Sequence, residues 1–417
     1  MNMNFIRVTD VYLGQLTCAV LTIMRRCIGF VSPERTPAGP VRSILFIKLI
    51  EQGATVLAGD SLRRAADLVG AENVHFCVFA DNRPILDVMG LVPPENVIAI
   101  RDDSLRAFIT DVFRAVRKMR RLHPGAVIDL EFFSRASAAL AYLSGAERRV
   151  GFHRFRGEGL YRGDLLTHRL VFNPYLHTAT VYSLLMEALA LDPGCIPLPK
   201  IPPPAQDRRL PGFVPDEATL ANVCETLAGL GVVPGKGPIV ILNPNASDIM
   251  PLRKWPQERF VELGKRLLAS NDRLSLIITG SAGEQTAAAR VCSAIGSPRA
   301  VSVAGQTTLR EVLALYTLAK VLVTNDSGPG HFAALTDVHA VVLFGPETPA
   351  RYAPVSPRSH VLWAGLACSP CINVHNHRFS PCKESRCMDA ITVEEVFEAV
   401  QSCLGHEYVT EFTNKGT

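Results

Sequence analysis

The sequence has little excess charge and no low-complexity tract. Its 417 residues carry 43 Lys and Arg against 39 Asp and Glu, which gives a net charge of +4. So small a surplus argues against a nucleic-acid-binding protein, because such proteins neutralise many phosphates with basic side chains. Hydrophobic residues make up 48% and charged residues 20%, as in folded globular proteins. The length predicts two or three domains.

The N-terminus lacks the features of a secretory signal peptide. Positive charge follows the first apolar run instead of preceding it, and there is no small-residue cleavage site. The run from Val11 to Met24 has about 14 residues, whereas a membrane-spanning helix needs about 20. Arg25 and Arg26 follow it directly. We expect either a helix in the cytoplasmic interface of a membrane or a helix of the protein core.

Cysteine shows no regular pairing over most of the chain. Most of the 11 cysteines stand singly in apolar runs, which is typical of small buried side chains in a reducing compartment. Four cluster in the pattern C-x₂-C-x₁₀-C-x₄-C, namely Cys368, Cys371, Cys382 and Cys387. The first pair has the spacing of zinc ligands, but the second is more widely spaced. A structural zinc site, a disulfide and free thiols all remain open.

Two proline-rich stretches divide the chain. Residues 33–40 follow the first apolar run, and residues 193–215 hold so many prolines that they exclude a helix or a central strand. We therefore expect an N-terminal helix and linker at 1–40, a first domain at 41–192, a linker at 193–215 and a second domain at 216–417.

Strand and helix patterns alternate in both domains. The expected strands are 43–49, 74–80, 96–100, 126–130 and 149–152, then 239–243, 275–279, 301–303, 321–324 and 340–344. Helical patterns separate most of them, as at 105–122, 134–143, 257–270, 284–295, 308–319 and 330–335. This alternation predicts an α/β protein with two parallel sheets, each covered by helices on both faces. Ligands bind such sheets beyond the carboxyl ends of the strands.

The sharpest local motif is VLVTNDSGPGHFAAL, at residues 321–335. An apolar strand ends at Asp326, and Ser327, Gly328 and Gly330 turn the chain into a helix that begins near His331. The N–H groups at such a helix start suit a diphosphate, and glycine permits positive φ and close approach of phosphate oxygens. The alternative is an ordinary strand-to-helix turn.

Two further segments carry charge at expected strand ends. In LNPNASDIMPLRKWP, residues 242–256, Arg253 and Lys254 stand just before Trp255 and are placed to neutralise phosphate. In IITGSAGE, residues 277–284, Glu284 opens a helix, where a carboxylate either accepts hydrogen bonds from ribose hydroxyls or interacts with the helix dipole.

These three segments, in this order, resemble glycosyltransferase family 9, the heptosyltransferases, as a divergent member. The resemblance covers about residues 42–400, and the signature Asp326-Ser327-Gly328-x-x-His331 carries most of it. It implies the GT-B fold, with two facing Rossmann-like domains and a deep cleft between them. The implied function is inverting transfer of heptose or a related sugar from a nucleotide-diphosphate donor to lipopolysaccharide or another envelope glycan. The implied location is the cytoplasmic face of the bacterial inner membrane.

The resemblance assigns the donor to the C-terminal domain. Arg253 stands where a family lysine contacts phosphate or sugar, Glu284 matches a ribose-binding glutamate and Thr307 falls where a residue packs on the base. The donor-binding residues expected are Asn245, Ser247, Lys254, Glu284, Thr307, Asp326, Ser327, Gly328 and His331. No Asp-x-Asp triad follows a strand convincingly, so we expect neither a metal nor a cofactor in the reaction.

The first domain departs from the family pattern at the proposed base. Lys48 and Gly53 match the family, but Ala54 replaces the aspartate that follows the glycine. Glu51, on the same loop, is therefore the expected catalytic base together with Arg253 as the catalytic cation. Glu131 and Asp164 are the next candidates for the base. The loss of the aspartate favours one alternative, a non-catalytic sugar-nucleotide-binding protein; a GT-B epimerase would need a pair of carboxylates.

The acceptor is expected in the first domain. Residues 151–168, GFHRFRGEGLYRGDLLTH, are rich in Arg, His and Gly and suit a hydroxylated or phosphorylated acceptor, although a plain surface loop is the alternative. The acceptor-binding residues expected are Lys48, His153, Arg162 and Asp164. A basic cluster at 114–123 either faces anionic lipid or is the solvated face of a helix.

Overall fold

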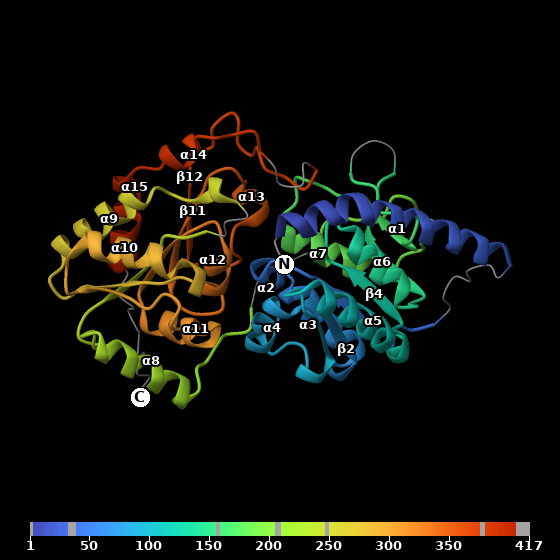
Figure 1. Cartoon of the computed structure of the whole chain (residues 1–417), viewed down its shortest axis with the longest axis horizontal. Helices are drawn as coiled ribbons and strands as arrows, with labels where there is room; N and C mark the ends of the chain where they lie inside the picture. The colour runs from blue at the N-terminus through green and yellow to red at the C-terminus, as the bar shows by residue number, and fades with distance from the viewer. Residues whose placement is uncertain are drawn as a thin grey trace, which may run out of the picture.

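Two parallel sheets, each with helices on both faces, form the protein (Figure 1). The computed structural model describes residues 3–31, 39–155, 159–204, 210–246, 250–375 and 380–405. Blue and green elements make up one domain, and yellow to red elements make up the other.

The first sheet has six strands in the order β3-β2-β1-β4-β5-β6, and its neighbouring strands pair in parallel. Its strands are β1 (Ile44–Ile47), β2 (Val74–Phe79), β3 (Val97–Ile100), β4 (Ala126–Asp129), β5 (Arg148–Phe152) and β6 (His168–Leu170). Its helices are α2 (Gln52–Leu57), α3 (Gly59–Val69), α4 (Arg83–Met89), α5 (Leu105–Leu122), α6 (Arg135–Leu143) and α7 (Thr178–Glu187).

The second sheet repeats this plan, with six parallel strands in the order β12-β11-β10-β7-β8-β9. Its strands are β7 (Ile239–Asn243), β8 (Ser275–Ile278), β9 (Ala300–Ser302), β10 (Val321–Asn325), β11 (His339–Phe344) and β12 (Ser359–Trp363). Its helices are α8 (Glu217–Gly229), α9 (Gln257–Ser270), α10 (Gln285–Ile295), α11 (Leu309–Leu318), α12 (Gly328–Ala333), α13 (Pro349–Tyr352), α14 (Arg386–Asp389) and α15 (Val393–Gly405).

Apolar runs place the strands at the centre of each domain because the side chains on both faces need cover. In the first domain, α5 and α6 cover one face of the sheet. In the second, α9, α10 and α15 cover the corresponding face. The remaining faces of both sheets belong to a single apolar core that continues from one domain into the other. Residues from α2, α4, α11 and α12 take part in this shared core.

Local sequence signals set the helix ends. The hydroxyl of Ser104 accepts a hydrogen bond from the N–H of Ala107 at the start of α5, and the hydroxyl of Ser134 accepts one from Ser137 at the start of α6. His123, with φ 44°, ends α5 directly before a proline.

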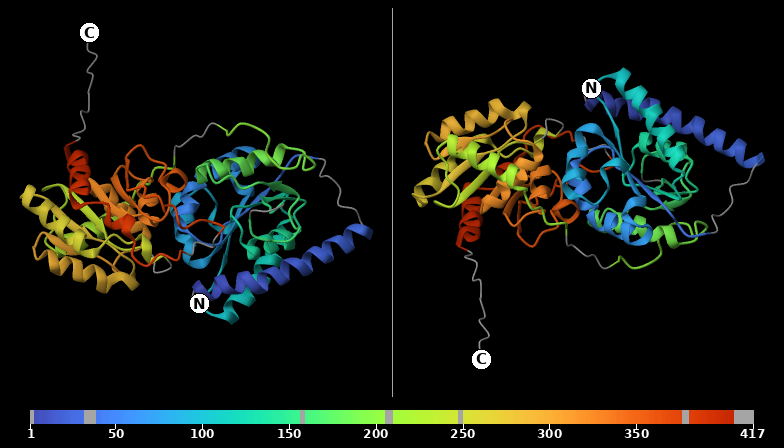
Figure 2. Two further views of the ribbon diagram at one scale, coloured as in Figure 1. Left: turned by 90° about the horizontal axis from the view of Figure 1, so that it is seen from above. Right: turned by 90° about the horizontal axis from the view of Figure 1, so that it is seen from below.

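Helix α1 (Met3–Val31) has 29 residues, about twice the length of the apolar run that predicts it. It starts near the domain boundary and its far end extends beyond the first domain (Figures 1 and 2). By length and composition alone, Thr9–Phe30 is long enough to cross a membrane, so the expectation of too short a helix was wrong. Only 17% of the apolar 18-residue window within this segment is buried, so the alternative of a core helix is wrong too.

Specific contacts hold α1 against the first domain. The Asp10 carboxylate accepts hydrogen bonds from the backbone N–H groups of Arg135 and Ala136 at the start of α6. Gly14 permits close approach, since a Cβ there would lie 2.8 Å from the Cβ of Arg135. Cys18 and Leu21 pack with α6 in a small apolar cluster.

Most expected elements are present, and two edge strands were missed. Ten predicted strands coincide with β1–β5 and β7–β11 to within two residues at either end. Strand β6 begins at His168, the last residue of the segment expected to be an acceptor loop, and the residues of β12 are half-buried or exposed. The proline-rich linker has no helix or strand in its described part, residues 193–204 and 210–215.

Candidate active site

The candidate active site lies at the switch point of each sheet, which is the place where the order of successive strands changes direction. The first sheet reverses between β1 and β4, and the second between β7 and β10. Ligands bind such sheets beyond the strand ends at this point. Lys48 and Glu131 follow β1 and β4, whereas Asn245 and Asp326 follow β7 and β10.

Lys48 joins two carboxylates at the switch point of the first sheet. Its buried Nζ donates to Oε2 of Glu131 at 3.0 Å and to Oε2 of Glu51 at 3.2 Å. The other oxygen of Glu131 accepts hydrogen bonds from the N–H groups of Leu49 and Ile50, which fixes its orientation. The side chain of Glu51 is 25% exposed against 9% for Glu131, so Glu51 is the more accessible carboxylate.

Glu51 also has an unusual backbone conformation. Its φ of 71° and ψ of 82° place it in the left-handed region directly before α2. Glutamate rarely adopts this region, and such strained residues concentrate at active sites. Sequence alone gives no signal for this conformation.

The two domains meet directly at Gly53. A Cβ on Gly53 would lie 2.5 Å from Cδ2 of His331, so a glycine is required by close packing. His331 lies within α12, and α2 and α12 pack against each other. Burial, with smaller contributions from His177 and Arg253, lowers the pKa of His331 to about 3. The imidazole is therefore neutral at physiological pH.

Arg253 lies between two buried carboxylates of the second domain. Its Nε is 3.4 Å from Oδ2 of Asp326, and its Nη2 is 3.2 Å from Oε1 of Glu347. Burial raises the pKa of Glu347 to about 7 despite the opposing effect of Arg253. Burial likewise raises the pKa of Asp326. Sequence reasoning missed Glu347, although its place directly after β11 was a signal of the same kind.

Asn325 holds the segment around Arg253 in place. Its side-chain N–H₂ donates to the carbonyl oxygens of Pro244 and Asn245, and its carbonyl oxygen accepts from the N–H of Trp255. The fully buried indole of Trp255 in turn donates to the carbonyl oxygen of Ile391. Arg253 and the half-buried Lys254 are thereby fixed beside the end of β10.

The glycines after β10 have a different function from the one expected. Neither Gly328 nor Gly330 adopts positive φ, so that part of the expectation is wrong. A Cβ on Gly328 would instead lie 2.9 Å from the ring of Phe332. The helix begins at Gly328, earlier than expected, and Ser327 donates its hydroxyl proton to the carbonyl oxygen of Asn325 at 3.1 Å.

The other expected donor residues lie on the neighbouring strand ends. The amide nitrogen of Asn245 would be 3.0 Å from a Cβ on Gly280, which adjoins Glu284. One carboxylate oxygen of Glu284 accepts from the N–H and hydroxyl of Ser281, so this residue caps the helix start. Thr307 is half-buried after β9. Ser247 lies outside the described residues.

The expected acceptor residues His153, Arg162 and Asp164 border a different cavity. A pocket of about 690 Å³ lies between α1 and the segment after β5. Its lining includes Ile23 and Arg26 of α1 beside these three residues. Asp164 forms ion pairs with Arg25 at 3.0 Å and with Arg169 at 2.8 Å, so positively charged side chains neighbour its carboxylate. Lys48 is not part of this pocket lining but belongs to the switch point.

Arg162 extends into the interior of the first domain. Its guanidinium pairs with the buried Asp129 and donates to the carbonyl oxygen of Phe132 at 3.1 Å. Burial raises the pKa of Asp129 to about 6, although Arg162 opposes the shift. Arg162 also donates to the carbonyl oxygen of Phe152 at 3.3 Å, so it links the carboxyl ends of β4 and β5.

Arg351 is a further cation that sequence reasoning missed. It is buried in α13 of the second domain, and its guanidinium lies 4.7 Å from the ring centre of Phe172 and 5.6 Å from that of Phe132. Both rings belong to the first domain, so Arg351 forms cation–π contacts across the interface. Arg351 also lies close enough to Glu347 to influence the pKa of that carboxyl.

None of the clustered cysteines forms a disulfide in the described part of the chain, so the disulfide alternative is wrong. Cys368 and Cys382 are exposed and Cys387 is buried. Within the described part of the chain, these four cysteines do not form a compact group of three or more metal-ligating atoms.

Two facing doubly wound domains of this kind define the GT-B architecture. The Escherichia coli ADP-heptose lps heptosyltransferase II structure matches with a TM-score of 0.65 at 22% identity, over 87% of this chain and 98% of that one. A glycosyl transferase family 9 structure from Veillonella parvula matches with a TM-score of 0.66 at 18% identity, over 88% of this chain and 97% of that one. The expected fold is thus confirmed.

The chain belongs to glycosyltransferase family 9 (heptosyltransferase), whose sequence profile matches residues 112–379. It is 28% identical to lipopolysaccharide heptosyltransferase 2 of Salmonella typhimurium over 232 residues, which is 54% of this chain and 61% of the relative. It is 30% identical to the Escherichia coli K12 protein of the same name over 128 residues, which is 30% of this chain and 36% of that relative. The alignments therefore span less than two thirds of these relatives.

Proposed function

We propose that the protein is an inverting glycosyltransferase that moves heptose or a related sugar from a nucleotide-diphosphate donor to a lipopolysaccharide-type acceptor. The meeting of the Glu51–Gly53 loop with His331 supports this most directly. It brings the carboxylates of one domain beside the family signature of the other, as transfer between two substrates in facing domains requires.

The donor occupies the switch point of the second sheet. Arg253 and Lys254 neutralise the diphosphate as it departs, together with the N–H groups around Ser327. Asn245, Glu284 and Thr307 lie on successive strand ends and contact the nucleoside. Since Arg253 is held by Asp326 and Glu347, it is preorganised before the donor binds. We propose that the reaction needs no metal ion, because these cations supply the positive charge.

Glu51 takes the proton of the acceptor hydroxyl. It is more exposed than Glu131, and Lys48 orients its carboxylate. The hydroxyl oxygen then attacks the anomeric carbon from the face opposite the leaving diphosphate, which inverts the configuration. Asp164 is the weaker candidate for the base because three arginines, Arg25, Arg26 and Arg169, surround its carboxylate.

We propose that the protein acts at the cytoplasmic face of the inner membrane, with α1 lying along the membrane surface. The exposed apolar side chains of α1 include Leu13, Leu16, Val20 and Ile23, which recur three or four residues apart and form a stripe. Its opposite side is fixed by Asp10 and Cys18 to the first domain. The adjoining pocket, with His153 and Arg26, then receives a polar part of the glycolipid acceptor.

The test is a transferase assay with the full chain. Incubation with ADP-heptose and a heptose-acceptor glycolipid should release ADP and extend the acceptor, whereas omission of the acceptor should leave only slow hydrolysis. A thermal-shift screen of ADP, GDP, UDP and CDP then identifies the base, since a ligand that binds the folded state raises the melting temperature. Failure of all four nucleotides to stabilise the protein would exclude the proposal.

The replacement at Ala54 favours one alternative, a sugar-nucleotide-binding protein without transferase activity. The two functions differ in one result. A binding protein is stabilised by a nucleotide but neither hydrolyses nor transfers the sugar with any donor or acceptor offered.

A further inference from the structure

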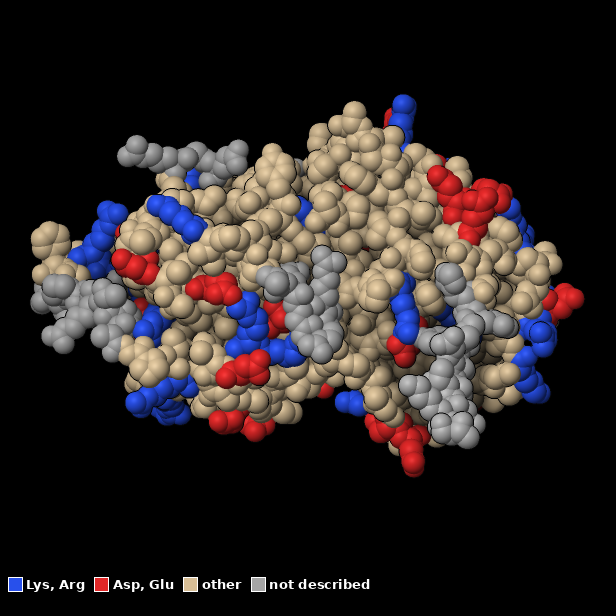
Figure 3. Space-filling model, turned by 180° about the vertical axis from the view of Figure 1, so that it is seen from behind, with Lys and Arg blue, Asp and Glu red and all other residues tan. Residues whose placement is uncertain are grey.

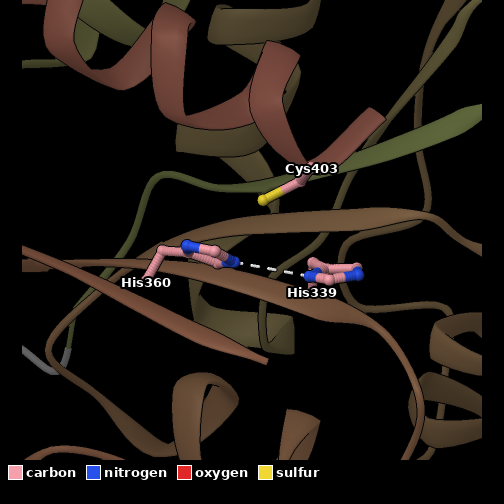
Figure 4. Close-up of side chains that lie close together, drawn as sticks. All are labelled: His339, His360 and Cys403. Carbon is pink, nitrogen blue, oxygen red and sulfur yellow. Dashed lines mark hydrogen bonds between the residues drawn. The ribbon is translucent and has the colours of Figure 1, made fainter. Parts of the chain in front are cut away.

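Two histidines and one cysteine converge at one end of the second sheet. His339 begins β11 and His360 lies in β12, where it pairs with Val341 in the parallel register. Because alternate residues share a face of a strand, both imidazoles lie on the face that α15 covers. Cys403 of α15 points toward them from above (Figure 4).

The three side chains have the spacing of metal ligands. Nδ1 of His339 is 3.4 Å from Nε2 of His360, and one ligating atom of each residue, including Sγ of Cys403, lies within 4.8 Å of the others. A tetrahedral zinc ion with bonds of about 2.0–2.3 Å separates its ligand atoms by about 3.3–3.8 Å. The nitrogens already have this separation, and Sγ reaches it by a movement of about 1 Å.

An imidazole pair without a metal explains only part of this arrangement. One shared proton accounts for the contact between His339 and His360, but it does not account for a thiol directed at both rings. Cys403 is 2% exposed, so its thiol faces the two rings and not solvent.

We propose that His339, His360 and Cys403 bind one transition metal ion, with Zn²⁺ as the ion that best fits two nitrogens and one sulfur. Three protein ligands leave one tetrahedral position for water. The site lies at the amino-terminal start of β11, whereas Glu347 follows the opposite end of that strand. The ion is therefore remote from the donor site, and its function is to fasten α15 to β11 and β12.

Cobalt titration of the full-length protein tests this proposal. After removal of metals with a chelator, Co²⁺ should bind with a stoichiometry of one and produce the near-ultraviolet absorption of a thiolate–cobalt bond. Cys403→Ser should abolish that absorption. His360→Ala should weaken cobalt binding on the order of 100-fold, at least as much as the loss of a residue that supports a metal ligand. Zn²⁺ should displace Co²⁺ and raise the melting temperature of the wild-type protein.

The other cysteine cluster provides the matched control. Cys371→Ser/Cys382→Ser removes two thiols near the surface and should leave the cobalt absorption unchanged. Loss of the absorption in this variant, or its persistence in Cys403→Ser, would overturn the proposal, as would the absence of cobalt binding to the wild-type protein. If Cys403→Ser does not fold, His339→Ala and His360→Ala decide the question, because both histidines are only half-buried.

Discussion

Gly53 and His331 lie in direct contact, where α2 of the first domain packs against α12 of the second. Gly53→Ala should therefore destabilise the protein by about 1–3 kcal/mol and lower turnover, because a Cβ collides with the imidazole. Gly229→Ala is the control, since a Cβ there meets nothing within 4 Å. Urea unfolding and the transferase assay measure both effects, and His331→Ala in the Gly53→Ala background should restore part of the stability.

Glu51→Gln should lower turnover by about 10²–10⁴-fold, the usual contribution of a general base. Nucleotide affinity should stay about the same as in the wild type, since we propose that the donor binds the other domain. Glu95→Gln, at an exposed position, is the matched control and should be neutral. Steady-state kinetics and calorimetry separate the two quantities. If Glu51→Gln retained wild-type turnover, Glu51 would not be the base. Glu131→Gln and Asp164→Asn would then test the two remaining candidates.

Arg253→Ala should weaken nucleotide-diphosphate binding by about 1.5–3 kcal/mol, the contribution of a hydrogen bond to a charged group. It should also slow the transfer itself, because the leaving diphosphate loses its counter-charge. Arg253→Lys keeps the positive charge but loses the planar guanidinium group, so its nucleotide affinity should lie between those of the wild type and Arg253→Ala. Isothermal titration of the nucleotide decides this, and unchanged affinity in Arg253→Ala would remove Arg253 from the donor site.

Leu13→Asp/Leu16→Asp/Phe30→Asp should reduce flotation of the protein with anionic vesicles while leaving its circular dichroism unchanged. The reason is that these side chains lie on the exposed part of α1, where Phe30 is 94% exposed. Tyr175→Asp/Val214→Asp changes two exposed apolar residues elsewhere and should not affect flotation. Equal flotation of the two variants would show that α1 makes no membrane contact.

His331 should make the protein less stable in acid. Its folded pKa of about 3 lies below that of an unfolded histidine, so between about pH 6.5 and pH 3 the unfolded chain binds the extra proton. Stability is therefore lost as the pH falls through this window. His331→Asn should make the slope of unfolding free energy against pH shallower, by up to about 1.4 kcal/mol per pH unit. Urea titrations at several pH values measure it; an unchanged slope would contradict the pKa. A residual slope should remain in His331→Asn, because burial also lowers the pKa values of His153 and His168 to about 4.

The central strands could be predicted because a short apolar run flanked by turn residues is compatible with few structures other than a buried strand. Edge strands gave no such signal: β6 reads HRL, and β12 is half-exposed. The length of α1 was also beyond prediction, since its polar and apolar residues mix before Val11 and after Met24. Burial and tertiary contacts, which sequence patterns do not record, decide these cases.

The residues of the candidate site divide in the same way. Arg253, Asp326 and His331 were singled out from the sequence because each lies in a recognisable segment after a strand, and the structure places Arg253 against Asp326. The positive φ of Glu51 and the cation–π contacts of Arg351 could not, because both depend on segments distant in sequence. The expected reason for a glycine at Gly328 was wrong, since the nearby ring of Phe332, and not a left-handed backbone, excludes a side chain there.

On the face shown in Figure 3, Lys and Arg side chains are interspersed with Asp and Glu, and broad uncharged areas lie between them. This face therefore gives little long-range electrostatic guidance to an anionic substrate.

The apolar core shared by both domains has a consequence for unfolding. Because residues of α2, α4, α11 and α12 belong to one core, neither domain can lose its structure without exposing apolar surface of the other. The donor affinity of one half is thus thermodynamically linked to the integrity of the other. A nucleotide that binds only the second domain should slow hydrogen exchange in the first as well, so the two halves behave as a single cooperative unit.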